Sequence, residues 1–205
     1  MTTTVDMWFD PRCPWAWIAS RWLLEVERVR DVAVRFHVLS LSVLNEGREV
    51  DEWYRAWLDA GWGPARVAKA VELRYGFAEV RAVYTALGNR IHLEKQPPGR
   101  ELYVTALTEA GLPVELADAA DSDALDAELL AGNRAGLGPV GEDLGTPAIH
   151  VLTPDGEVTA FFGPVVTPTP RGEAAGRLWD GVLLVAGTEG FYELKRARTS
   201  SPVVG

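Results

Sequence analysis

Cysteine is almost absent from this sequence. Cys13 is the only cysteine among 205 residues, so the chain can form no internal disulfide and can run no dithiol cycle of its own. One cysteine and three scattered histidines do not have the spacing of zinc ligands, and we expect no metal. No Gly-x-Gly-x-x-Gly motif follows a predicted strand and no Gly-x-Ser-x-Gly motif occurs, so we expect neither a nucleotide cofactor nor a serine-hydrolase site.

Long hydrophobic runs and an excess of positive charge are also missing. No apolar segment approaches the ~18 residues of a membrane span, and the first residues lack the basic and apolar regions of a signal peptide. We therefore expect a cytoplasmic protein with no membrane partner. The net charge of −9 argues against a nucleic-acid partner, because affinity for the phosphate backbone comes from clustered Lys and Arg.

Cys13 lies at the junction of a predicted strand, Thr4 to Phe9, and a predicted helix, Pro14 to Arg30. Pro14 suits the first helical position, where a missing N–H costs nothing. Cys13 is then the N-cap, with its sulfur beside unpaired N–H groups and the positive end of the helix dipole. We expect this setting, helped by Arg12, to lower the pKa of Cys13 and favour a reactive thiolate. The alternative is a buried cysteine that merely packs.

The rest of the chain alternates between strand and helix periodicities. A second strand is predicted at Val32 to Val38, and the pattern is helical from about Asn45 to Gly138. Two strands follow, with a tight turn between them, and then a last helix. The strands are predicted at Ala148 to Leu152 and Glu157 to Phe162, and the turn at Thr153 to Gly156. The last helix is predicted from Thr169 onward. The order predicts an α/β, thioredoxin-like fold made of residues 1–44 and 139–205, with an inserted all-helical subdomain at 45–138.

The Cys13 stretch also resembles a known family. Cys13-Pro14-Trp15-Ala16 is similar to the Cys-x-x-Cys element of the DsbA-like branch of the thioredoxin superfamily, with Ala16 in place of the second cysteine. Whether Ala16 is natural or introduced is left open by the sequence. A longer, ordered set of segments resembles the mycothiol-dependent nitroreductase and DsbA-type oxidoreductases of actinobacteria. These are 9–11, 17–22, 39–46, 88–92, 141–143, 145–147, 161–164, 170–173 and 191–196.

The resemblance implies several site residues. Pro147 would be a cis proline facing Cys13, and the Thr146 backbone could pair with an incoming thiol ligand; the alternative is an ordinary trans proline that starts a strand. Asn45 and Tyr54 match residues that line the cleft in the nitroreductase group, although a turn Asn and a packing Tyr would look the same. Trp15, in the first helical turn, could stack on a flat substrate.

Histidines away from Cys13 carry weaker signals. His37 is interpreted as structural, because it is a lone strand histidine. Asn89, Arg90 and His92 could share a helix surface and bind an anionic part of a ligand. Capping and surface roles are the simpler interpretation of these three residues.

Three functions are compatible with these features. The first is a DsbA-like monothiol oxidoreductase that uses a low-molecular-weight thiol, mycothiol by resemblance. Cys13 would form a mixed disulfide that a second thiol resolves, and nitroaromatic or other electrophilic substrates could be reduced. The second is a thiol transferase or thiol-dependent isomerase like kappa-class glutathione transferase and 2-hydroxychromene-2-carboxylate isomerase. The third is a non-enzymatic binding protein. We expect a small thiol and a flat aromatic substrate as partners, and the sequence leaves a homodimer open.

Overall fold

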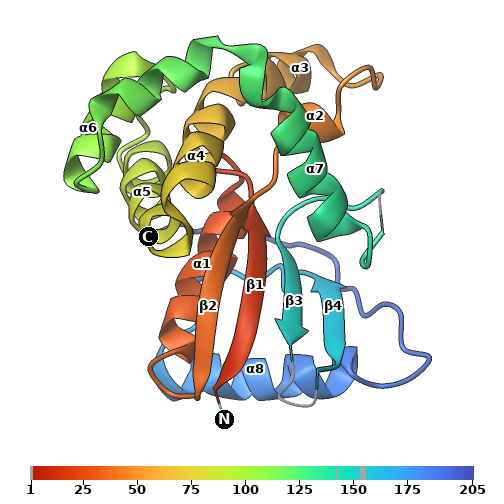
Figure 1. Cartoon of the computed structure of the whole chain (residues 1–205). Helices are drawn as coiled ribbons and strands as arrows, with labels where there is room; N and C mark the ends of the chain where they lie inside the picture. The colour runs from red at the N-terminus through yellow and green to blue at the C-terminus, as the bar shows by residue number, and fades with distance from the viewer. Residues whose placement is uncertain (1, 142, 153–155) are drawn as a thin grey trace.

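The sheet is the centre of the structure, a computed structural model that describes residues 2–141, 143–152 and 156–205. Its four strands have the order β2-β1-β3-β4. Strand β1 (Thr3–Phe9) pairs in parallel with β2 (Val32–Val38) and antiparallel with β3 (Ala148–Leu152). Strand β4 (Val158–Phe162) is antiparallel to β3. This mixed sheet, with a helix crossing over between β1 and β2, confirms the predicted thioredoxin-like fold (Figure 1).

Helices account for most of the remaining chain. Helix α1 (Pro14–Val26) forms the crossover and packs with α8 (Gly172–Ala186). All the other helices that the structure describes lie between β2 and β3 in the chain and form the upper part of Figure 1. They are α2 (Leu41–Leu44), α3 (Glu52–Asp59), α4 (Trp62–Tyr75), α5 (Phe77–Gly88), the π-helical turn η1 (Asn89–Leu93), α6 (Arg100–Glu109), the 3₁₀ helices η2 (Val114–Asp121) and η3 (Asp123–Leu125), and α7 (Asp126–Leu137). The division into domain and subdomain stays a prediction.

Several predicted boundaries change. Helix α1 ends at Val26 and not at Arg30, because the chain must reverse there to enter β2 at Val32. Within the predicted helical stretch, acidic helices are expected at Pro113 to Ala120 and at Asp123 to Ala131. The first is the 3₁₀ helix η2, and the second is η3 followed by α7, which runs on to Leu137. The predicted turn at Thr153 to Gly156 falls on residues 153–155, outside the described residues. None of the described helices has the length and apolar character needed to cross a bilayer.

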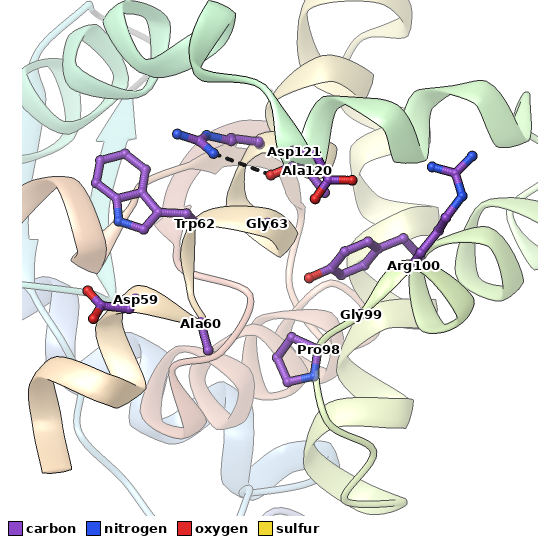
Figure 2. Close-up of a pocket in the computed structure, with 11 residues that line it drawn as sticks. Asp59, Ala60, Trp62, Gly63, Pro98, Gly99, Arg100, Ala120 and Asp121 are labelled. Atoms are coloured by element: carbon purple, nitrogen blue, oxygen red, sulfur yellow. Dashed lines mark hydrogen bonds between the residues drawn. The ribbon is translucent and has the colours of Figure 1, made fainter.

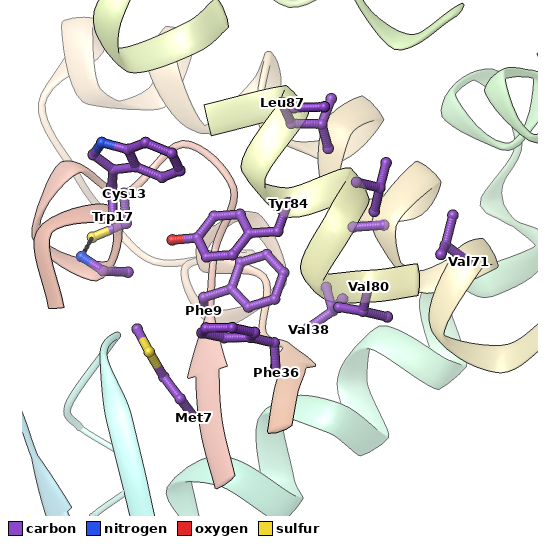
Figure 3. Packing of buried hydrophobic residues seen from close by; sticks show 14 of the residues in the cluster. Met7, Phe9, Cys13, Trp17, Phe36, Val38, Val71, Val80, Tyr84 and Leu87 are labelled. Atoms are coloured by element: carbon purple, nitrogen blue, oxygen red, sulfur yellow. Dashed lines mark hydrogen bonds between the residues drawn. The ribbon is translucent and has the colours of Figure 1, made fainter. Parts of the chain in front are cut away.

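An aromatic cluster joins the sheet to α1 and α5. The Phe9 and Tyr84 rings are stacked, with centroids 3.6 Å apart, and the edge of Trp17 meets Tyr84 at 5.7 Å. Phe36 packs edge-on against both Phe9 and Tyr84. All four side chains are buried, and Figure 3 shows them beside Cys13. Because Phe9 ends β1 and Trp17 lies in the first turns of α1, this cluster fixes the strand–helix junction that holds the cysteine.

The opposite face of the sheet carries charged groups. Asp6 accepts hydrogen bonds from Arg35 at 2.6 and 2.5 Å and lies 2.8 Å from His37 Nε2. Burial would raise the pKa of Asp6, but the bonds with His37 and Arg35 lower it to about 2. The second ring nitrogen of His37 faces Glu72 of α4 at 3.5 Å, and Glu72 also pairs with Lys69. His37 therefore belongs to a structural charge network, in agreement with its sequence interpretation.

Close packing at Gly88 gives a first prediction. A Cβ added at Gly88 would lie 2.0 Å from the ring of Trp17, a buried side chain that cannot move away. Gly88→Ala should therefore destabilise the fold by about 1–3 kcal/mol, the usual range for overpacking. Gly181→Ala in α8 is the matched control, because its Cβ would meet nothing within 4 Å and should stabilise by about 0.5–1 kcal/mol. Urea unfolding measures both; equal effects would contradict the packing.

Candidate functional site

Cys13 is the N-cap of α1, as predicted from the sequence. Pro14 is the first helical residue, and the Ala16 N–H donates to Cys13 Sγ over 3.5 Å. On its other side the Cys13 thiol donates to the Thr146 carbonyl oxygen, also at 3.5 Å. The sulfur thus lies between a backbone donor of α1 and a backbone acceptor of the segment before β3. The cysteine is only 5% exposed.

The predicted lowering of the Cys13 pKa is wrong for this structure. Burial raises the pKa of the thiol to about 12, and the Asp10 carboxylate adds to the increase. The backbone N–H groups of Ala16 and Trp15 act in the opposite direction but do not outweigh burial. Since a thiol that donates to a carbonyl must be protonated, the hydrogen bond to Thr146 is consistent with the same conclusion. Cys13 is held here as a thiol.

Asp10 is a charged neighbour of Cys13 that the sequence interpretation missed. Its carboxylate is 1% exposed and accepts N–H bonds from Arg12 at 2.8 Å and from Leu41 at 2.7 Å. Burial raises the pKa of Asp10 to about 6 despite these bonds.

Arg12 does not support the thiolate as expected. Its guanidinium lies 4.5 Å from the centroid of the Trp57 ring and donates to the Trp57 carbonyl oxygen.

Thr146 and Pro147 lie opposite the cysteine. The peptide bond between them is cis, and both residues are buried. The Thr146 hydroxyl donates to the Trp8 carbonyl oxygen at 2.7 Å, and the Pro147 carbonyl accepts from Gly163 N–H at 2.8 Å. These bonds to β1 and to the end of β4 hold the Thr146 carbonyl oxygen against Cys13.

A cavity of about 800 Å³ opens beside Cys13. This volume is within the range of small-molecule sites. Four of its lining residues are aromatic and three are charged. The full lining is Cys13, Pro14, Trp15, Leu41, Glu49, Val50, Asp51, Trp53, Tyr54, Trp57 and Arg198. The cavity therefore brings together the start of α1, the insertion around α3 and the C-terminal tail.

Helix α3 supplies the aromatic wall of this cavity. The Tyr54 ring stacks on Trp57 with centroids 5.7 Å apart and an interplanar angle of 18°. Burial raises the pKa of Tyr54, and the charge of Asp10 adds to this increase. Asn45 is not among the lining residues. Its side-chain amide donates back to the Leu41 carbonyl oxygen at 2.8 Å, closing the end of α2.

His92 is buried, so its surface interpretation is wrong. The imidazole is 4% exposed, stacks on Trp17 with centroids 5.4 Å apart, and bonds the Pro11 carbonyl oxygen through Nε2 at 2.9 Å. Burial lowers the pKa of His92 to about 4, and the bond to Pro11 only partly offsets it. Arg90 instead pairs with Glu109 at 2.7 Å. His92 thus braces the loop that leads into Cys13.

A second cavity, of about 490 Å³, lies in the helical part between α4, α6 and η2 (Figure 2). Arg66 lines this cavity and donates hydrogen bonds to the Asp126 carboxylate at 2.7 and 2.8 Å and to the Ala120 carbonyl oxygen at 3.3 Å. Arg100 on the same wall pairs with Asp118. Its described lining holds no cysteine or histidine, so the cavity at Cys13 is the candidate site for chemistry.

Comparison with known proteins agrees with this geometry. A protein-family model described as "Rv2466c-like: Mycothiol-dependent nitroreductase Rv2466c" matches residues 12–196. This match places the protein among the thiol-dependent oxidoreductases, which are enzymes, and its sheet with the crossover helix has the thioredoxin-like fold. The chain belongs to the Rv2466c-like family.

Individual relatives are more distant. The chain is 29% identical over 204 residues to the uncharacterized protein Rv2286c of Mycobacterium tuberculosis, covering 98% of this chain and 85% of that protein. Cytosolic disulfide reductase DsbM from Pseudomonas aeruginosa is similar in structure, with a TM-score of 0.56, 18% identity, and 88% and 98% of the two chains covered. A 2-hydroxychromene-2-carboxylate isomerase matches with a TM-score of 0.56 and 13% identity over 88% and 94%. These two structures support the fold alone.

The charge of Asp10 gives a second prediction. Cys13 is the only thiol, so the alkylation rate against pH reports its pKa directly. Asp10→Asn removes a charge that raises this pKa and should accelerate iodoacetamide labelling at pH 8 by about three- to tenfold, since one pKa unit is a factor of ten. Asp51→Asn is the control, because Asp51 lines the cavity without contributing to the Cys13 pKa. Equal acceleration in both variants would rule out a specific role for Asp10.

His92 gives a third prediction. Its folded-state pKa of about 4 lies below the ordinary 6.5, so its stabilising effect is complete above pH 6.5 and is lost as the pH falls towards 4. The loss amounts to about 3 kcal/mol. His92→Gln should therefore be less stable than the wild type at pH 7, and the difference should shrink by up to that amount at pH 4.

Urea unfolding between pH 4 and 7 measures the His92 effect. His37→Gln is the control with the opposite sign, since burial would lower the His37 pKa but the bonds with Asp6 and Glu72 raise it. The gap between wild type and His37→Gln should widen as the pH falls. A pH-independent gap for His92→Gln would contradict the burial of a neutral imidazole.

Proposed function

We propose that this protein is a monothiol, mycothiol-dependent oxidoreductase in which Cys13 forms a mixed disulfide with the thiol and an aromatic electrophile is reduced in the adjoining cavity. The observation that carries the proposal is the placement of Cys13 at the start of α1, facing Thr146 and opening into an aromatic cavity. The family match supports mycothiol as the thiol. Dependence on mycothiol also supports a cytoplasmic location, where small thiols are kept reduced.

The reaction balances with one protein thiol. A nitro compound, the Cys13 thiol and one mycothiol would give the nitroso compound, water and a Cys13–mycothiol mixed disulfide. A second mycothiol then attacks the mixed disulfide, which returns Cys13 as a thiol and releases mycothiol disulfide. Two thiols are oxidised for each two-electron reduction. Ala16 stands where a second cysteine would be needed to resolve the intermediate internally.

Activation of Cys13 would accompany entry of ligand or water. Burial is the largest cause of its raised pKa, so polar groups that enter the cavity remove part of that penalty. The Ala16 N–H is already in place to receive a thiolate. Protonation of Asp10, whose pKa is about 6, would remove the opposing charge and help in the same direction.

The lining of the cavity suits the sugar part of mycothiol. Mycothiol is an acetylcysteine attached to an uncharged glucosaminyl-inositol, which carries many hydroxyl groups and no carboxylate. The Glu49 and Asp51 carboxylates can accept hydroxyl hydrogens, and the stacked Tyr54 and Trp57 rings can cover a sugar face. Glutathione would bring two carboxylates towards the same two acidic residues. We assign Trp15, at the other end of the cavity, to binding of the aromatic substrate.

The fourth prediction tests Cys13 by intact-protein mass spectrometry. Wild-type protein incubated with mycothiol disulfide should gain the mass of one mycothiol, removable by reductant, because a single thiolate can form a single mixed disulfide. Cys13→Ser should show no adduct and no thiol-dependent turnover. Ala16→Cys is the matched variant: the introduced thiol should displace mycothiol and leave an internal disulfide, so that the adduct is only transient.

Two outcomes would contradict the redox mechanism. Full turnover in Cys13→Ser would mean that the sulfur takes no part. Turnover without any adduct in the wild type would favour the thiol transferase or isomerase alternative, in which the residue at the helix cap holds a thiol without bonding to it.

A further inference from the structure

The end of the C-terminal tail is hydrogen-bonded to α1, the helix whose N-cap is Cys13. After α8 the chain has no further helix or strand, and it runs back to end beside α5 (Figure 1). Its end is held by two hydrogen bonds, from Trp17 Nε1 to the Val204 carbonyl oxygen at 3.2 Å and from Val203 N–H to Thr167 Oγ1 at 2.8 Å. Val204 also packs against the main core. An irregular tail is thereby held close to α1.

This course brings Arg198 into the Cys13 cavity. Its guanidinium carbon lies 5.6 Å from the centroid of the Trp15 ring, and the residue lines the cavity with Cys13 and Pro14. Arg198 is the one cationic side chain in the described lining, and among the described residues no carboxylate forms an ion pair with it. It also lies just beyond residues 12–196, which the family model matches.

We infer that Arg198 is a specificity-determining residue, which binds the oxygen pair of a nitro or carboxylate group on an aromatic acceptor stacked against Trp15. A guanidinium presents two parallel N–H groups that match the two oxygens of either group. The guanidinium carbon lies 5.6 Å from the centroid of the half-buried Trp15 ring. A flat ligand stacked on the part of the ring that Arg198 leaves open would therefore place its substituent within reach of the guanidinium. The inference rests on the proposed function, in which this cavity holds the acceptor.

The charged residues of the cavity favour one position for a ligand with negative charge. Glu49 and Asp51 give the cavity two carboxylates, which repel an anionic ligand wherever it binds near them. Only the end of the cavity at Trp15 and Arg198 carries a compensating positive charge. A carboxylate on the acceptor, or the partly negative oxygens of a nitro group, are therefore directed to the Trp15 end, and the polyhydroxy thiol is left with the α3 end. The two partners would meet at Cys13.

The test measures binding without turnover. In a Cys13→Ser background, 2-naphthoate and its neutral isostere 2-naphthamide are titrated by calorimetry at low and high salt. With Arg198 present, naphthoate should bind about three- to tenfold more tightly than the amide, as expected for a partly exposed ion pair, and high salt should weaken this preference. Arg198→Gln should abolish the preference, whereas Arg198→Lys should keep part of it.

Matched variants separate the alternatives. Arg196→Ala removes a neighbouring positive charge that does not line the cavity and should leave the preference intact. Trp15→Ala should weaken both ligands equally. The inference is overturned if Arg198→Gln keeps the preference, if Arg196→Ala removes it to the same extent, or if neither ligand binds. Because no thiol chemistry occurs in this background, failure here leaves the mixed-disulfide experiment to decide the proposed function separately.

Discussion

The Cys13 sulfur is held by two backbone groups that come from distant parts of the chain, the Ala16 N–H of α1 and the Thr146 carbonyl oxygen before β3. The first contact requires α1 to begin at Pro14. The second requires β3 to lie beside β1, which the Thr146 hydroxyl secures by its bond to Trp8. Phe9, Tyr84 and Trp17 then fix the strand and helix that meet at the cysteine. A displacement of any of these elements would move the sulfur from its donor or from its acceptor.

Burial and hydrogen bonding at Cys13 act against each other. The low exposure of Cys13 raises the pKa of its thiol, whereas the backbone N–H groups at the helix start lower it by a smaller amount. The balance depends on what occupies the cavity, since solvent or a polar ligand changes burial without changing the backbone contacts. Asp10 beside the cysteine and the Tyr54 hydroxyl across the cavity respond to the same environment, and burial raises the pKa of both.

Local patterns predicted local structure well. The Cys-Pro step and the apolar spacing after it were enough to predict the helix start and the N-cap, because both depend on neighbouring residues. The pKa of Cys13 was predicted with the wrong sign, because its burial comes from side chains far away in the sequence. His92 looked like a surface residue for the same reason: its partner is the Pro11 carbonyl oxygen, 81 positions earlier. No periodicity marks the tail, so nothing in the sequence pointed to Arg198. The roles of the site residues stay predictions.

Helix α3 differs from the start of α1, on the other side of the cavity, in how few of its residues are buried. Only Leu58 of its eight residues is buried, and Trp53 is 70% exposed. The start of α1, in contrast, is anchored in the core, because Ala16, Trp17 and Ile18 are all buried. The wall formed by α3 can therefore move more easily than the wall formed by the start of α1. A bulkier ligand would be accommodated by displacement of the aromatic wall, while the cysteine, the cis proline and the sheet beneath them keep their positions.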